Sequence, residues 1–450
     1  MDFIDEVIAQ SLSFPIPFNN SYIFPSNCFG VFVTIRRSKQ DQLIQWPQDV
    51  HGCIGNWNPT FQPLTPNEIQ QMTFQVAKEA FYHDSRRYEF SREFFEDPHL
   101  TVEIDFLLLP LTEIIHGKLK NTNEPFHNDK YGFIYQGQFR HATYLPNVFP
   151  PDTSWSTIQQ SIQNKAGNYT DGKYYAYPIQ QISKTLWEFW KNSYGITMRN
   201  QFLTSMSQWI DQTTWIPYQV TSTLVQSNPH EDVRNVATLL DIGNYMDKSQ
   251  KEFPHLKEKW KEYVQYYQEH WKELSPQALS FLIQIPQLLE KEEMKQVLQK
   301  RLESKYINRA FEWGEIILGL GKNPSNQQLL QSGKNLGNQI DDVFQLNWDS
   351  QVIGQGRNKT NETIVKIYVE AWKRWWKTVS IYQREDIESN YLVVAIEGMS
   401  SLNVQELESK IYTLVYQLAQ SGRWKSNGLI VFRDGKEARI DISCHLYNSI

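Results

Sequence analysis

One short segment, HGCIGNW at residues 51–57, combines residue types that can carry out nucleophilic chemistry. Cys53 lies between Gly52 and Gly55, two residues that permit tight backbone geometry and the close approach of another molecule. In an extended strand, residues i and i+2 face the same side, so the His51 imidazole and the Cys53 thiol could meet. Such an imidazole would lower the thiol pKa and enrich the reactive thiolate. The alternative is that Cys53 is a small buried hydrophobic residue and that the glycines only shape a turn.

The surrounding sequence predicts an α+β unit, an antiparallel sheet with flanking helices, that would hold this segment. Residues 28–37 and 100–111 are rich in β-branched and aromatic residues, as strands are, and residues 131–145 predict a hairpin. Between the first two runs, apolar residues recur at spacings of three and four from Ile69 to Phe81, after Thr65 as a cap and Pro66 at the first helical position, so a helix is predicted in residues 65–84. The order strand, helix, strand, hairpin indicates an α+β fold.

The remainder of the chain has a helical pattern. Long amphipathic segments rich in Trp, Gln, Glu and Lys predict an all-α domain of helical hairpins or a partial α/α-toroid. Gly243, Gly319 and Gly398 recur at nearly equal spacing late in apolar helical patterns, which suits stacked hairpins. The alternative is an ordinary helical domain whose helices end in glycine caps. Pro and Gly residues near 172–178 predict a boundary that gives two domains, 1–185 and 186–450.

Composition limits the classes of function. The chain has 450 residues and a net charge of −6, which gives no signal for a nucleic-acid-binding protein. Its three cysteines are far apart, so neither a zinc site nor a disulfide framework is predicted. It contains no phosphate-binding or dinucleotide-binding loop, and we predict no cofactor and no metal. The N-terminal residues lack a basic signal region and no long apolar run occurs, so we expect a cytoplasmic protein without membrane spans.

The N-terminal third resembles the AMMECR1 domain family over about residues 25–180. Five blocks follow the order of the family: the strand GVFVTIRR, then HGCIG where the family has L-R-G-C-I-G, then HDSRRY, LTVEIDFLLLPLTEI, and the hairpin with the helix after it. The resemblance implies an α+β fold of two subdomains around an antiparallel sheet, with the GCIG segment lining a groove. It implies no defined reaction. Family members encoded beside Memo-like and radical-SAM proteins suggest partners in a shared modification pathway.

The resemblance also indicates further candidates for the groove. Asp84 would orient an imidazole or pair with an arginine, and Arg86 would bind a carboxylate or phosphate. Together with Gly52 and Gly55, Arg86, His141 and Tyr144 are therefore the candidate substrate-binding residues, and Cys53, His51 and Asp84 the candidate catalytic residues. Histidine at position 51 departs from the arginine that the family prefers, which puts an anion-anchoring role there in doubt. The alternatives are a structural ion pair or a helix-terminus cap for Asp84 and Arg86, and a core position for Tyr144.

Two classes of function stay open, and whether the protein is an enzyme is undecided. The first is a Cys53-dependent modifying enzyme for a small, peptide or nucleotide substrate, with His51 as base. The second is a non-catalytic recognition or scaffold protein, with the helical domain binding a partner or a carbohydrate. The helical half contains many Trp residues and the acids Glu312, Glu315, Glu397 and Asp441, and paired carboxylates are what glycoside hydrolysis requires. Trp at helical spacing, however, is usually a core residue.

Overall fold

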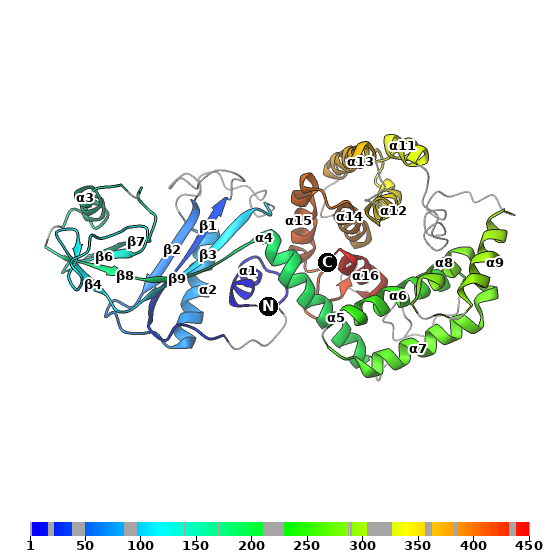
Figure 1. Ribbon diagram of the computed structural model, residues 1–450, viewed down its shortest axis with the longest axis horizontal. Coiled ribbons are helices and arrows are strands. Elements are labelled where there is room, and N and C mark those ends of the chain that lie inside the picture. Colours follow the sequence, from blue (N-terminus) through cyan, green and yellow to red (C-terminus); the bar gives the residue numbers. More distant parts are fainter. Residues whose placement is uncertain are drawn as a thin grey trace. The chain divides into compact units, whose positions relative to one another are not determined.

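The computed structural model describes residues 2–16, 22–37, 50–84, 97–138, 140–150, 152–169, 171–209, 229–249, 251–286, 288, 290–303, 326–355, 362–381, 386–431 and 438–449. Contacts divide the chain into two compact units. The first unit contains Met1–Leu12 and Asn19–Phe189, and the second contains Ser13–Phe18 and Trp190–Ile450. In Figure 1, the colours run from blue to green up to Phe189 and from green to red from Trp190 onward.

The first unit contains a four-stranded antiparallel sheet in the order β2-β1-β3-β9. Its strands are β1 (Cys28–Arg37), β2 (Val50–Trp57), β3 (Leu100–Leu108) and β9 (Ile179–Thr185). Helix α2 (Pro66–Tyr82) packs on β1 and β2, and α1 (Phe3–Ser11) packs on α2. Helix α2 begins at the predicted cap, because the Thr65 hydroxyl and the Glu68 carboxylate exchange hydrogen bonds with each other's backbone N–H.

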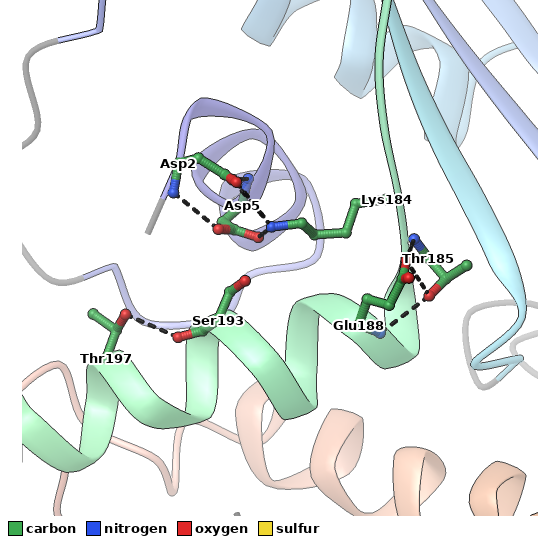
Figure 2. Close-up of polar contacts among 7 residues, drawn as sticks. All are labelled: Asp2, Asp5, Lys184, Thr185, Glu188, Ser193 and Thr197. Atoms are coloured by element: carbon green, nitrogen blue, oxygen red, sulfur yellow. Dashed lines mark hydrogen bonds and ion pairs between the residues drawn. The ribbon is translucent and has the colours of Figure 1, made fainter.

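Helix α1 is joined to the sheet by a buried ion pair. Lys184 of β9 donates to the Asp5 carboxylate at 2.7 Å and to Asp2 at 3.1 Å (Figure 2). Burial raises the pKa of Asp5 to about 6, and the hydrogen bond from Lys184 opposes that rise. The sheet then ends in a capping box, in which Thr185 and Glu188 satisfy each other's backbone N–H groups. Charged groups therefore fix the N-terminal helix to the edge of this unit.

A second antiparallel sheet completes the first unit, in the order β5-β4-β8-β6-β7. Its strands are β4 (Thr112–Ile115), β5 (Lys118–Leu119), β6 (Gly132–Gln136), β7 (His141–Tyr144) and β8 (Lys173–Tyr177). Strands β6 and β7 form the predicted hairpin, and α3 (Trp155–Lys165) packs against β7. Two antiparallel sheets with flanking helices confirm the predicted α+β class for the N-terminal part.

The second unit is mostly helical, as predicted. After α4 (Leu186–Glu188), which ends the first unit, a π-helix (Phe189–Tyr194) leads into it. Its helices are α5 (Gly195–Trp209), α6 (Pro229–Lys248), α7 (Pro254–Glu269), α8 (Pro276–Gln284), α9 (Lys291–Glu303), α11 (Asn326–Asn335), α12 (Asp342–Gln355), α13 (Glu362–Ile381), α14 (Ser389–Leu402), α15 (Gln405–Gln420) and α16 (Ile440–Asn448). Two short strands, β10 (Ile430–Val431) and β11 (Ala438–Arg439), pair before α16.

Nine of these helices stack in two rows. Helices α12, α14, α16, α6 and α8 contact one another in that order, and we call them the inner row (Figure 1). Helices α13, α15, α7 and α9 each pack against an inner-row helix. Gly243 and Gly398 lie inside α6 and α14, where a Cβ atom would come within 2.8 and 2.6 Å of the Trp260 and Trp372 rings. At both positions the absence of a side chain leaves room for a tryptophan of a neighbouring helix. The alternative that these glycines cap the ends of helices is therefore wrong. Gly319 lies outside the described residues.

Candidate functional site

The side chain of Cys53, the predicted nucleophile, lies on the face of the first sheet that points away from α2. In β1, Val31, Val33 and Ile35 alternate with Phe32 and Thr34. Thr34 is paired with Cys53 on β2 and with Glu103 on β3. Residues directly opposite each other share a face of a sheet, so these three side chains form one row.

Cys53 has a polar neighbour in this row. The Thr34 hydroxyl donates to the Cys53 Sγ at 3.2 Å, and Thr34 itself is fully buried. The Cys53 side chain is partly exposed, whereas Cys28 and Cys444 are buried. Burial raises the pKa of Cys28 to about 11, which keeps that thiol protonated near neutral pH. A hydroxyl that donates to sulfur stabilises a thiolate, so Cys53 is the cysteine best placed for thiolate chemistry.

Asp84 positions the backbone of Cys53. Its Oδ2 accepts a hydrogen bond from the Cys53 N–H at 2.8 Å, and only 5% of Asp84 is exposed. Among the strands that the structure describes, β2 lies at the edge of its sheet, so its outward N–H groups face no neighbouring strand there. Asp84 follows α2 and supplies an acceptor for the N–H of Cys53. Arg86, the other candidate from the same turn, lies outside the described residues.

The strand is irregular at His51. Ile35 pairs with Gly52, but Arg36 pairs with Val50, so His51 is an extra residue in a β-bulge. Strict alternation, the basis for placing His51 on the same face as Cys53, does not continue through a bulge. His51 is partly buried, and its role as a base stays a prediction.

The two glycines beside Cys53 make room for other parts of the protein. A Cβ atom on Gly52 would lie 2.2 Å from the carbonyl oxygen of Ala80 in α2. A Cβ atom on Gly55 would lie 2.1 Å from the ring of Phe32, which is stacked on Trp57. The space beside each glycine is therefore filled by a helix on one face and by an aromatic ring on the other. Their predicted role in substrate binding stays a prediction.

Asp105 of β3 is a candidate that sequence analysis missed. It pairs with Phe32, whose other partner is Gly55, so it shares the face of Cys53. Only 2% of Asp105 is exposed, and burial together with the charge of Glu103 raises its pKa to about 7. Hydrogen bonding by Gln181 at 2.9 Å opposes the rise. The signal in the sequence was an acid directly between the apolar residues Ile104 and Phe106 of the strand.

A buried ion pair completes the polar face. Arg36 Nε donates to Glu103 Oε2 at 2.7 Å, in the row next to that of Asp105. Strands lie about 4.8 Å apart, so β1 separates Asp105 from Cys53 by roughly 10 Å. Asp105 is therefore too far from Cys53 to accept a proton directly from its thiol, and it can act on Cys53 only through its charge. Among the described residues, no group of three or more His, Cys, Asp or Glu side chains could hold a metal ion.

The second sheet contacts this face through Tyr177. Burial raises the pKa of Tyr177 well above its ordinary value, and the charges of Asp105 and Cys53 add to the rise. The Tyr177 hydroxyl lies 2.8 Å from that of Thr143 and donates to the Tyr144 carbonyl at 3.1 Å. Tyr177 is thus close enough to respond to both candidate groups while it is held by strand β7.

The remaining two candidates lie on the second sheet. The Tyr144 hydroxyl is 3.0 Å from Ser161 of α3, and Lys165 lies 4.4 Å above its ring. His141 is exposed on β7, the edge strand, where it pairs with Gln136. The structure thus brings Thr34, Asp84 and Cys53 together directly, and it connects Tyr144 to them through its carbonyl group and Tyr177.

Comparison with known proteins gives the family of this unit. The AMMECR1 family model matches residues 6–180. The N-terminal part of the chain carries an AMMECR1 domain. The predicted resemblance is confirmed, and the G-C-I-G segment of this AMMECR1 domain is the part of β2 that contains Cys53.

Comparisons with solved structures and with curated proteins give little information beyond the AMMECR1 match. One similar solved structure is an uncharacterised protein of Pyrococcus horikoshii, at 18% sequence identity and a TM-score of 0.29. The alignment covers 40% of this chain and 88% of that chain. The search of curated proteins found no match. No helix in the described part of the chain is long and apolar enough to cross a membrane.

Proposed function

We propose that the AMMECR1 domain of this chain is a thiol-dependent modifying enzyme in which Cys53 is the nucleophile. The observation that carries the proposal is the hydrogen bond of 3.2 Å from the buried Thr34 hydroxyl to the sulfur of a partly exposed cysteine. Cys28, on the neighbouring strand, lacks this exposure, and its raised pKa makes it a poor nucleophile. The AMMECR1 match itself assigns no activity.

The chemistry that fits is transfer or hydrolysis through a covalent intermediate. The Cys53 thiol gives its proton to a base, for which His51 is the candidate, and the sulfur attacks an electrophilic carbonyl carbon of the substrate. The leaving group departs with a proton, and the resulting thioester is cleaved by water or by a second nucleophile, which restores the thiol. The Asp84 hydrogen bond holds the Cys53 backbone during both steps.

The charges of this face favour a small, peptide or nucleotide substrate with polar groups. Arg36 is paired with Glu103, so its charge is already compensated. Asp105 has a pKa of about 7, so near neutral pH it is present as both a hydrogen-bond donor and an acceptor. Arg86 stays our candidate for binding a carboxylate or phosphate of the substrate.

The rate of alkylation of Cys53 at neutral pH tests this proposal. In the full chain with Cys28→Ser and Cys444→Ser, iodoacetamide should react faster with native Cys53 than with the urea-unfolded chain, because an activated thiol holds more thiolate. Thr34→Val should slow the reaction of the native chain by removing the donor. The matched control is Thr143→Val, which removes a buried hydroxyl that bonds to Tyr177 instead. A native rate at or below the unfolded rate would contradict the proposal.

A non-catalytic recognition role is the second candidate, and one observation favours it. The Cys53 N–H and the spaces beside Gly52 and Gly55 are all occupied by the protein's own groups. A cysteine whose surroundings are filled by the protein itself can have a packing role alone. In this case the polar face of the sheet would bind the end of a peptide or a nucleotide. Slow alkylation of Cys53 and an unchanged rate in Thr34→Val are the results that this alternative requires.

A further inference from the structure

Asp105 of β3 is a buried acid that takes no part in the steps proposed for Cys53. Only 2% of Asp105 is exposed, and its Oδ1 accepts a hydrogen bond from Gln181 at 2.9 Å. Its Oδ2 has no hydrogen-bond partner among the residues that the structure describes. An ionised carboxylate has about four sites that accept hydrogen bonds, so a single donor satisfies little of this group. The charge of Asp105 is therefore available to act on other groups.

Strand pairing places Asp105 on the same face of the sheet as Cys53. Asp105 on β3 and Gly55 on β2 both pair with Phe32 of β1, and Cys53 lies in the next row along the strands. Neighbouring strands are about 4.8 Å apart, so the positions of Asp105 and Cys53 are separated by roughly 10 Å. At this separation the two side chains interact through charge and not through a hydrogen bond.

Buried side chains lie between the two positions. Thr34 is fully buried, and 9% of Phe32 is exposed. Phe32 and the fully buried Tyr177 belong to one apolar cluster, and Cys53 packs against this cluster from its rim. Water screens the interaction of two charges strongly, whereas buried side chains screen it much less. The charge of Asp105 is therefore felt at the partly exposed thiol.

The cation nearest to these acids in the described part of the face is already paired. Arg36 lowers the pKa of Asp105, but its Nε is bonded to Glu103 at 2.7 Å. The Asp84 carboxylate accepts a hydrogen bond from the N–H of Cys53 at 2.8 Å. The described charged groups around Cys53 are thus mostly acidic. A positively charged group is favoured beside such a set of acids, and a second anion is disfavoured.

The negative charge on Asp105 depends on pH near neutrality. Burial, together with the charge of Glu103, raises the pKa of Asp105 to about 7. Arg36 of β1 and the hydrogen bond from Gln181 of β9 oppose this rise, and Tyr177 of β8 lies close enough to respond to the charge. Asp105 is therefore mostly neutral at about pH 5.5 and mostly ionised at about pH 8.5.

We propose that Asp105 determines which substrates react at Cys53, a selectivity that rests on the proposed thiol chemistry. Its negative charge favours a substrate with a protonated amino group beside the reacting carbonyl carbon, and it disfavours a carboxylate or a phosphate there. An anionic group bound by Arg86 would have to lie farther from Asp105. The substrate class is thus an amine-bearing carbonyl compound, such as an amino-acid derivative or a peptide with a free amino group.

The reaction of Cys53 with two thiol reagents of opposite fixed charge tests the proposal. The reagents are trimethylammonioethyl methanethiosulfonate, a cation, and sulfonatoethyl methanethiosulfonate, an anion. Their rates are measured at low ionic strength in the full chain with Cys28→Ser and Cys444→Ser, and each is divided by the rate of the urea-unfolded chain at the same pH. Two unit charges about 10 Å apart change a rate about twofold at the dielectric constant of water and about 16-fold at an effective value of about 20. The cation-to-anion ratio should therefore rise by at least about fourfold from about pH 5.5 to about pH 8.5.

Asp105→Asn assigns this change to one residue, because asparagine does not titrate. The ratio in Asp105→Asn should stay constant between the two pH values, and Asp152→Asn, at an exposed carboxylate, should behave as the parent chain does. An equal rise in the parent chain and in Asp105→Asn would assign the effect to another group, such as His51, and would overturn the proposal. A rise below about fourfold in the parent chain would overturn it as well, even if Asp105→Asn does not fold.

This experiment also separates the proposal from the thiol chemistry on which it rests. Both reagents need the thiolate, so the ratio of their rates does not depend on how much thiolate Cys53 holds. Slow alkylation of native Cys53 by iodoacetamide would contradict the nucleophile assignment and leave the ratio unchanged. A ratio that does not change with pH would contradict the role of Asp105 and leave the nucleophile assignment in place.

Discussion

Replacing Asp105 with asparagine should flatten the pH dependence of the stability of the AMMECR1 domain. Asp105 is 2% exposed in β3, and burial raises its pKa from 3.8 to about 7. Asparagine has nearly the same shape, keeps an oxygen that accepts the hydrogen bond from Gln181, and does not titrate. The substitution therefore removes the charge and little else.

The magnitude follows from the difference between the two pKa values. Between 3.8 and about 7, folded Asp105 holds a proton that the unfolded chain has released. The free energy of unfolding therefore falls as pH rises through this window, and the loss is complete above the folded pKa. One pKa unit corresponds to about 1.4 kcal/mol, so a rise from about pH 5 to about pH 8 costs the wild type roughly 3 kcal/mol through Asp105. Asp5, with a pKa raised to about 6, titrates in both proteins and cancels in the comparison.

Labelling of Cys28 gives an assay that reports this unit within the full chain. Cys28 is fully buried in β1, which pairs with β3, so a thiol reagent reaches it only when the unit opens. The free energy of opening is measured for both proteins at both pH values, with the labelling rate of the unfolded chain as the reference. Between about pH 5 and about pH 8, the wild type should lose roughly 3 kcal/mol more of this free energy than Asp105→Asn does. Asp152→Asn, at an exposed carboxylate, is the matched control. A change below about 0.5 kcal/mol between the two pH values would refute the reasoning.

Three further substitutions test the packing of the two units. Lys184→Met should destabilise the first unit by about 3–5 kcal/mol in urea unfolding at alkaline pH, because the buried Asp5 carboxylate loses its partner. The destabilisation should become smaller toward acidic pH, where Asp5 is protonated, and a destabilisation that does not change with pH would contradict this reasoning. Gly398→Ala should destabilise the helical unit by about 1–3 kcal/mol, because its methyl group would meet the Trp372 ring, and an unchanged denaturation midpoint would refute the contact. Phe14→Ala should cost the helical unit about 3–5 kcal/mol, and an effect on Cys28 labelling instead would place Phe14 in the other unit.

The elements of the fold could be predicted where local signals determine them. The strand at 28–37 is a run of β-branched and aromatic residues, and α2 begins directly after Thr65 because a capping box and a proline coincide there. Helical periodicity identified the second half. The role of Gly243 and Gly398 was not accessible, because a tryptophan from another helix decides it.

The site was only partly accessible, since its contacts depend on register. Thr34 and Cys53 meet because two strands pair in one particular alignment, and a shift of one residue would turn them to opposite faces. The β-bulge at His51 shifts the register in this way, and no feature of the local sequence predicts it. Asp105 was missed for a related reason, because its burial depends on how β3 is covered by other parts of the fold and the local sequence does not show it.

One causal chain links the two motifs on which the AMMECR1 resemblance depends. Gly52 has no side chain, so the carbonyl group of Ala80 in α2 can approach β2 closely. Asp84, which follows α2, then reaches the N–H of Cys53. That bond satisfies an edge-strand donor and fixes the residue whose sulfur accepts from Thr34 on the opposite side. The glycine and the aspartate therefore both act on Cys53 through the backbone, which connects the G-C-I-G segment with the aspartate that follows α2.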